Sequence, residues 1–141
     1  MASREETLAE YRIFSIRSPP FADHKRDLEW TCRSLGFLES RDKGKTAHRI
    51  FGALVESAKE SKGYPSDKLA EMIGLSRGTI VHHLNKMIKS GLVIHHEGLY
   101  KLRGRSLKTT IEEITRDVDR IFEDLLKVAE SIDENLGLYS R

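Results

Sequence analysis

Residues 66–102 read SDKLAEMIGLSRGTIVHHLNKMIKSGLVIHHEGLYKL, and this stretch decides the fold of the chain. Three apolar residues in its first part share helical spacing and are expected to face inward: Leu69, Met72 and Ile73. Ser66 is a favourable N-cap, and Gly74 is suited to the positive φ at which many helices end. Ser76 is a second N-cap soon afterwards. The sequence therefore predicts two short helices joined by a tight turn.

The second helix is expected to run from Arg77 to Lys89, and its two faces differ in character. One face is apolar and is expected to be buried: Ile80, Leu84, Met87 and Ile88. The opposite face offers amide, imidazole and ammonium donors and carries no acid: Gly78, His82, Asn85, Lys86 and Lys89, flanked by Thr79 and Val81. Such a face suits a groove lined with phosphates.

A β-hairpin is expected directly after this helix, from Leu92 to Leu102. Residues 92–94 have the composition of a strand, residues 95–98 of a turn, and residues 99–102 of the returning strand. Two short helices followed by a hairpin form a helix-turn-helix with a wing.

At this point the stretch resembles a known family, the winged helix-turn-helix of ArsR-type regulators and their archaeal relatives. The residues that carry the resemblance are Leu69-Ala70, Gly74-Leu75-Ser76, Thr79-Ile80, His83-Leu84 and Ser90-Gly91-Leu92-Val93. The resemblance covers roughly residues 45–105. His83 stands where many plain helix-turn-helix units have an aliphatic residue, although a His-Leu pair is common in ArsR-like chains. The family resemblance implies sequence-selective binding of double-stranded DNA by a dimer, with the second helix in the major groove and the hairpin beside the DNA backbone.

On this interpretation the DNA-binding residues fall into two groups. Base edges are expected to be contacted by Gly78, Thr79, His82 and Asn85. Phosphates are expected to be contacted by Arg77, Lys86, Lys89, Lys101, Arg103 and Arg105. Charge supports this view, because residues 44–105 carry a net +6, whereas residues 1–43 are neutral and residues 106–141 carry −4.

The winged domain is expected to occupy residues 44–105, and residues 1–43 before it form an N-terminal extension. The first helix of the winged domain precedes the stretch quoted above. Residues 3–9 suit a short helix and residues 11–16 suit a strand equally well, whereas residues 21–38 are expected to be helical. Trp30 and Cys32 are expected to pack against the winged domain or a second subunit. After a charged link over residues 39–46, apolar residues at helical spacing predict a helix: Ala47, Ile50, Phe51, Leu54, Val55 and Ala58.

The last region, residues 106–137, is expected to form one long helix capped by Ser106. Its apolar residues recur at alternating steps of four and three: Leu107, Ile111, Ile114, Val118, Ile121, Leu125, Val128 and Ile132. This heptad seam is typical of a coiled coil. A helix of this length, about 46 Å, exceeds the winged domain, so a second copy is expected to cover it in a homodimer. The alternative is a monomer whose last helix folds back over residues 21–38. Altogether the expected fold is mainly α (α+β).

Other functions find little support in the 141 residues. One cysteine, Cys32, excludes a disulfide framework. No apolar run approaches the ~18 residues of a membrane span, and no signal peptide is evident, so we expect a cytoplasmic protein without a membrane partner. Adjacent histidines chelate poorly, and no catalytic or phosphate-binding motif occurs. We therefore expect neither an enzyme nor a bound cofactor or metal. An effector is not identifiable, and the competing interpretation is a winged-helix protein-interaction module of a larger complex.

Overall fold

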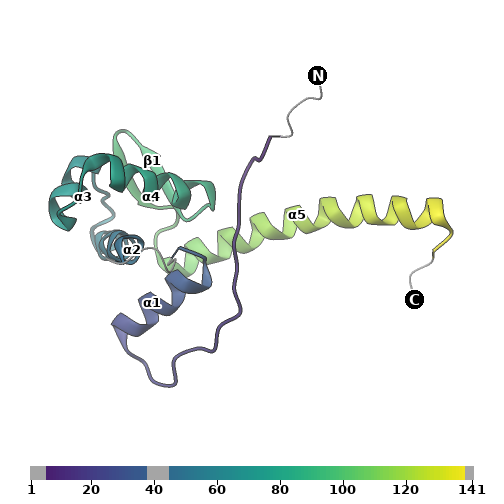
Figure 1. Ribbon diagram of the computed structural model, residues 1–141, viewed down its shortest axis with the longest axis horizontal. Coiled ribbons are helices and arrows are strands. Elements are labelled where there is room, and N and C mark those ends of the chain that lie inside the picture. Colours follow the sequence, from purple (N-terminus) through teal and green to yellow (C-terminus); the bar gives the residue numbers. More distant parts are fainter. Residues whose placement is uncertain (1–5, 38–44, 139–141) are drawn as a thin grey trace.

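The computed structural model describes residues 6–37 and 45–138. Its elements follow in the order α1 (His24–Ser34), α2 (Thr46–Ser57), the 3-10 turn η1 (Ala58–Glu60), α3 (Ser66–Ile73), α4 (Arg77–Lys89), β1 (Val93–His96), β2 (Leu99–Leu102) and α5 (Leu107–Leu136). Figure 1 shows α2, α3, α4 and the hairpin gathered at one end, with α5 extending away from them. This is a winged helix-turn-helix with a long C-terminal helix, which confirms the predicted fold class.

The core of the winged unit lies between α2, α3, α4 and the hairpin. Its fully buried apolar side chains include Ile50, Phe51, Leu54, Leu69, Ile80, Leu84, Met87 and Leu92. The predicted inner stripes of α2 and α4 are therefore confirmed. Met72 departs from the prediction, because its side chain is 44% exposed. The inner face of α3 consists of Ser66, Leu69 and Ile73, and Met72 lies about 90° away from the middle of that face.

Most of the predicted helix ends are confirmed. Gly74 ends α3 with a φ of 79°, and the Ser76 hydroxyl accepts a hydrogen bond from the Thr79 backbone N–H at 3.2 Å. Ser106 caps α5 in the same way. Ser66 is the exception: Pro65 precedes the helix as its N-cap residue, and Ser66 is the first helical residue. The buried Ser66 hydroxyl instead accepts a hydrogen bond from Nε of Arg77 at 2.9 Å, which ties α3 to α4.

The wing has a tighter turn than the sequence predicts. Only Glu97 and Gly98 form it, with φ values of 51° and 78°, as in the two-residue turns that match strand twist. His95 and His96 belong to β1, so the prediction that they lie in the turn is wrong. The His95 ring stacks on that of Tyr100, its partner in the ladder, with 3.9 Å between centroids. This cross-strand pair extends the ladder by two residues.

The N-terminal segment, defined as residues 6–19, forms neither helix nor strand. Both open alternatives are therefore wrong for the described part, while residues 3–5 lie outside it. Backbone hydrogen bonds attach this segment to distant helices: Glu10 N–H donates to the Lys89 carbonyl, and Phe14 N–H donates to the Ser34 carbonyl. Contacts that are remote in sequence leave no local periodicity, which explains why the sequence was ambiguous here.

Helix α1 is shorter than the predicted 21–38. Asp23 caps its start, because the carboxylate accepts the Lys25 N–H, and the chain turns at Gly36 with a φ of 75°. Cys32 packs against the winged unit as expected and is fully buried in its core, whereas the indole N–H of Trp30 donates to the Ile16 carbonyl of the N-terminal segment. Residue 38 and the predicted link, apart from residues 45 and 46, lie outside the described residues.

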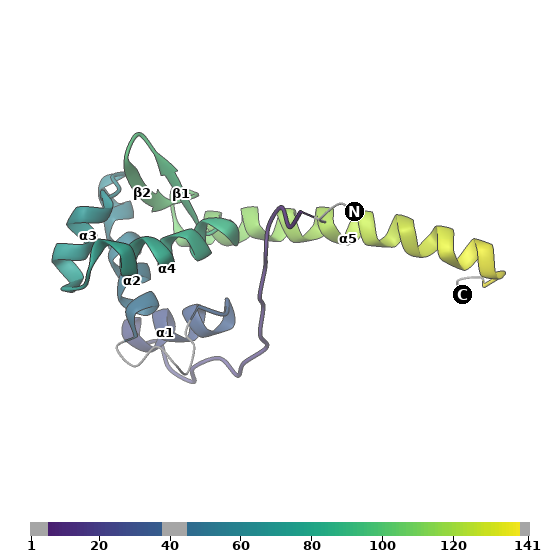
Figure 2. The ribbon, with the colours of Figure 1, turned by 45° about the horizontal axis from the view of Figure 1, so that its top comes forward.

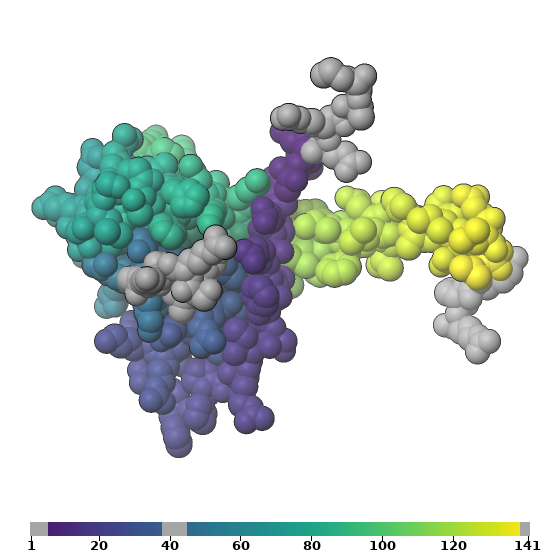
Figure 3. All heavy atoms as spheres, in the orientation of Figure 1, coloured from purple at the N-terminus to yellow at the C-terminus, as the bar shows by residue number. Residues whose placement is uncertain are grey.

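Helix α5 has two halves with different surroundings. In the first half, Leu107, Ile114 and Val118 pack against the core of their own chain. In the second half the apolar side chains are exposed by 42–68%: Ile121, Phe122, Leu125, Leu126, Val128, Ile132 and Leu136. Figures 2 and 3 show this half standing clear of the body, without folding back over α1. The heptad seam is therefore covered by its own chain in the first half of α5 and exposed to solvent in the second half.

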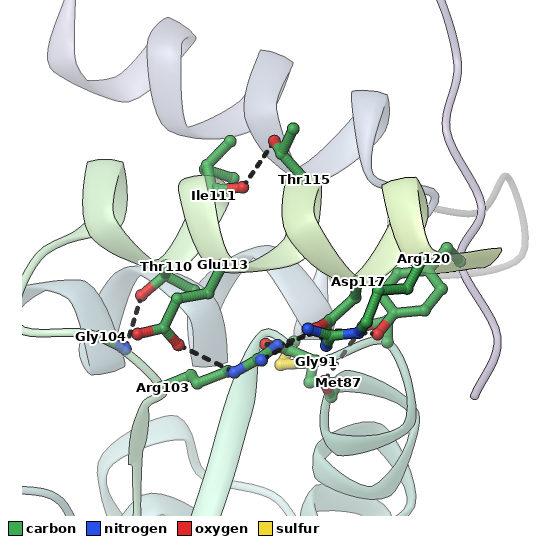
Figure 4. Close-up of polar contacts among 12 residues, drawn as sticks. Met87, Gly91, Arg103, Gly104, Thr110, Ile111, Glu113, Thr115, Asp117 and Arg120 are labelled. Carbon is green, nitrogen blue, oxygen red and sulfur yellow. Dashed lines mark hydrogen bonds and ion pairs between the residues drawn. The ribbon is translucent and has the colours of Figure 1, made fainter. Parts of the chain in front are cut away.

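A cluster of charged side chains, here called the Asp117 cluster, joins α5 to the body (Figure 4). Both oxygens of the Asp117 carboxylate accept hydrogen bonds from the Arg103 guanidinium, and the Tyr11 hydroxyl donates to one of them at 2.7 Å. Arg120 reaches the same carboxylate, and Glu113 lies 2.9 Å from Nε of Arg103. The Arg103 hydrogen bonds outweigh the effect of burial and lower the pKa of Asp117 to about 2.

This low pKa predicts a loss of stability in acid. The folded-state pKa lies below the ordinary 3.8, so the ionised Asp117 contributes its full stabilisation above about pH 4 and loses it as the pH falls towards 2. The contribution is about 2 kcal/mol. Asp117→Asn should therefore be less stable than wild type at pH 6, and the gap should shrink by pH 2.5. Urea unfolding followed by circular dichroism, at one fixed protein concentration, measures both. A gap of equal size at the two pH values would assign the effect to something other than the carboxylate.

Candidate nucleic-acid interface

Helix α4 presents one continuous polar line to solvent. Gly78, His82, Asn85 and Lys89 are spaced by four, three and four residues, so they lie along one side of the helix, and all four are exposed. The stripe formed by Ile80, Leu84 and Met87 lies on the other side and is fully buried. Because α4 contains no Asp or Glu, the exposed line offers hydrogen-bond donors and carries no carboxylate of its own.

The N-terminal end of this line is open. A Cβ atom at Gly78 would have no other atom within 4 Å, so nothing in the described chain covers the helix at this point. Thr79 is exposed, and its hydroxyl is 2.8 Å from the Ser76 hydroxyl, so it belongs to the helix cap as well. A bare backbone at the start of a helix allows close approach of a sugar-phosphate chain.

Arg77 begins α4 and is held from one side only. Its Nε donates to Ser66 and lies 3.4 Å from the exposed Asp67 carboxylate, yet 69% of the side chain remains exposed. These contacts direct the side chain over the junction of α3 and α4. The cation is therefore oriented and still accessible to a ligand.

The hairpin lies next to α4 in both ribbon views (Figures 1 and 2). Lys101 is half-buried and Arg105 is exposed, so both are accessible cations near the wing. At the tip, Nε2 of His96 lies 3.6 Å from the Glu97 carboxylate, so an acid accompanies the histidine there.

Arg103 occupies a different environment from the one that its charge suggested. Its side chain is 27% exposed and lies between Asp117 and Glu113 of α5. A guanidinium that two carboxylates already engage is poorly available to a phosphate. We therefore leave Arg103 out of the DNA contacts proposed below. Sequence analysis also missed Asp117 and Tyr11, and the signal available was slight: an acid directly beside Val118 of the apolar seam.

The histidines do not converge on one point. The rings of His82 and His83 meet edge to face with centroids 5.7 Å apart, and His95 stacks on Tyr100. Within residues 6–37 and 45–138, no three side chains of His, Cys, Asp or Glu are grouped as a metal site would require. None of the helices in this part of the chain has the length and apolar character needed to cross a bilayer.

Comparison with known proteins gives one match. Residues 64–95 match the family model described as "Bacterial regulatory protein, arsR family". The matched segment begins just before α3, contains all of α4 and ends within β1. No curated protein and no solved structure matches the chain.

The fold and this match together define the class: residues 64–95 carry an ArsR-type helix-turn-helix, which lies within a winged fold. This unit supports a DNA-binding transcription regulator. The exposed line of α4 lies within the matched segment, so the surface described above is the natural candidate for the interface.

If the line on α4 binds DNA, then Lys89→Ala should weaken binding to every duplex tested and reduce the slope of log K against log salt by about one. The reason is that one fewer counterion is released on binding. Lys127→Ala, an exposed lysine in the distal half of α5, is the matched control and should change neither quantity. Fluorescence anisotropy of labelled duplexes at four or five salt concentrations gives both numbers. An unchanged slope for Lys89→Ala would move the interface away from this end of α4.

Proposed function

We propose that the protein is a sequence-specific transcription regulator that binds double-stranded DNA as a homodimer. In this proposal α4 enters the major groove and the wing, from Leu92 to Leu102, lies near the backbone. The observation that carries the proposal is the exposed, acid-free line of α4 inside the segment that matches the ArsR family model. Such a regulator would act in the cytoplasm.

The exposed residues divide by reach and chemistry. Asn85 and His82 carry donors and acceptors that suit base edges, and Gly78 and Thr79 lie beside them at the helix start. The cations proposed to contact phosphates are Arg77, Lys86, Lys89, Lys101 and Arg105. The first three come from α4, Lys101 comes from the wing and Arg105 from the link that follows it, so they would flank the groove that α4 occupies.

The proposal of a homodimer rests on the distal half of α5. Leu125, Val128 and Ile132 are each more than half exposed, and their neighbours on the same stripe are exposed as well. A continuous apolar stripe of this size is unusual on a monomer and is typical of an interaction site. The same seam on a second copy is self-complementary and supports pairing of two α5 helices in a coiled coil.

The residue most diagnostic of sequence recognition is Asn85. Its amide can bond an adenine in two places, so Asn85→Ala should relax the preference at a single base pair by about 1–3 kcal/mol. Affinity for random DNA should change little, in contrast to Lys89→Ala. Selection from a library of randomised sites, with sequencing of the bound fraction, provides the measurement. A selection profile identical to that of wild type would exclude Asn85 from base contact.

The dimer can be tested through one exposed leucine. Leu125→Glu should leave the winged unit folded, because the side chain is 56% exposed, and should convert the dimer to a monomer in light scattering. Binding to a duplex with two half-sites should fall by tenfold or more, whereas binding to one half-site should persist. Lys127→Glu adds a glutamate nearby as the matched control and should remain dimeric.

Light scattering of the wild-type protein, together with its retention on heparin or random DNA, distinguishes the proposed regulator from the competing function. A wild-type protein that is monomeric and is not retained by heparin or random DNA would favour a protein-interaction module. In that case the distal half of α5 would be the surface that docks onto a different chain. A dimeric Leu125→Glu protein would instead place the subunit interface elsewhere on the molecule.

A further inference from the structure

Helix α5 is attached to the winged unit along a narrow line. Three of its side chains are buried, Thr110, Ile114 and Asp117, and they follow one another at steps of four and three residues. Thr110 accepts the Gly104 N–H at 2.9 Å, and Ile114 enters the apolar core. Asp117 is the last of the three, so it is the buried residue nearest to the exposed half of the helix.

The Asp117 carboxylate joins segments that are far apart in sequence. Arg103 directly follows the wing, and Tyr11 comes from the N-terminal segment. Arg103 also approaches the Gly91 carbonyl, two residues beyond the end of α4, at 3.5 Å. The last residue of α4, Lys89, accepts a hydrogen bond from Glu10, the neighbour of Tyr11. One carboxylate is thus linked to the wing, to the end of α4 and to the N-terminal segment.

The packing around Gly91 shows how closely these groups fit. Gly91 has a φ of 78°, and a Cβ atom there would lie 2.9 Å from Arg103, 3.2 Å from Asp117 and 3.2 Å from the Tyr11 hydroxyl. A side chain at this position would therefore displace the cluster. The segment just after α4 therefore packs closely against α5 at Asp117, with little free space between them (Figure 4).

We propose that Asp117 is a positioning residue that fixes the direction of α5 relative to α4, and so sets the half-site spacing that the dimer selects. This inference rests on the proposed function. In a dimer joined by the distal half of α5, the distance between the two α4 helices depends on the angle that each α5 makes with its own winged unit.

The length of the helix makes this angle consequential. About 19 residues separate Asp117 from the end of α5, which corresponds to a lever of about 28 Å. A rotation of about 10° at the cluster would displace the other end by about 5 Å, which exceeds the 3.4 Å rise of one base pair. Loosening the cluster should therefore broaden spacing selectivity before it alters how one α4 helix binds one half-site.

The test uses the full-length protein and a set of duplexes in which two half-sites, taken from the selected binding sequence, are separated in steps of one base pair. For wild type, affinity should peak at one spacing. For Asp117→Asn, the ratio of affinities between the best spacing and spacings one or two base pairs away should fall by fivefold or more. Light scattering should still report a dimer, and affinity for a single half-site should stay within about twofold.

Two further variants keep the test decisive. Asp119→Asn changes an exposed acid of the same helix and should leave the spacing profile as in wild type. Tyr11→Phe removes one hydrogen bond to Asp117 at the surface of the cluster, and should broaden the profile to a smaller extent. If Asp117→Asn does not fold, Tyr11→Phe decides the matter.

The outcomes separate this inference from the proposed function. A sharp wild-type profile that Asp117→Asn and Tyr11→Phe both retain would overturn the role of Asp117 and leave the dimeric regulator intact. A wild-type protein that binds no half-site, or shows no preferred spacing, would overturn both. A sharp wild-type profile that broadens in these variants, with the single half-site unaffected, supports the inference.

Discussion

The structure depends on the division of α4 into a buried side and an exposed side. Ile80, Leu84 and Met87 are fully buried in the core that α4 shares with α2, α3 and the hairpin, and each such side chain contributes about 1.5–3 kcal/mol to folding. Rotating α4 about its axis would bring its histidines and lysines into an apolar core without partners, at a cost of several kcal/mol. The apolar packing therefore fixes which residues face solvent. The exposed line of Gly78, His82, Asn85 and Lys89 is a consequence of what lies beneath it.

Those parts of the fold that depend on local patterns could be predicted from the sequence. The stripes of α2 and α4, the cap at Ser76 and the end of α3 at Gly74 each rest on residues within one or two turns of one another. Two differences from the prediction also concern local geometry. The eight-residue helix α3 has too narrow an inner face for Met72, and the stacked pair of His95 and Tyr100 extends the ladder, so that the turn is shorter than its composition suggests.

The candidate site could also be predicted only where it depends on a local pattern. The acid-free side of α4 follows from periodicity alone, and its exposure agrees with the structure. Arg103 shows the limit of that reasoning, since a basic residue after a wing is as suited to a carboxylate as to a phosphate, and only the position of Asp117 on α5 distinguishes the two. The N-terminal segment was equally beyond prediction, because its hydrogen bonds join Tyr11 to a residue more than 100 positions away.

The change of environment along α5 explains why an ion pair lies beside the middle of an apolar seam. A continuous hydrophobic surface holds a helix by area and tolerates rotation or sliding, because many registers bury similar amounts of it. A carboxylate bound by two hydrogen bonds to one guanidinium does not tolerate such movement, because a small displacement breaks these hydrogen bonds. Besides the stability that it contributes, a partly buried ion pair can favour one arrangement of the packed elements over others. In this chain the ion pair lies where the internal part of the seam ends and the exposed part begins, which is the point at which the direction of the free half is decided.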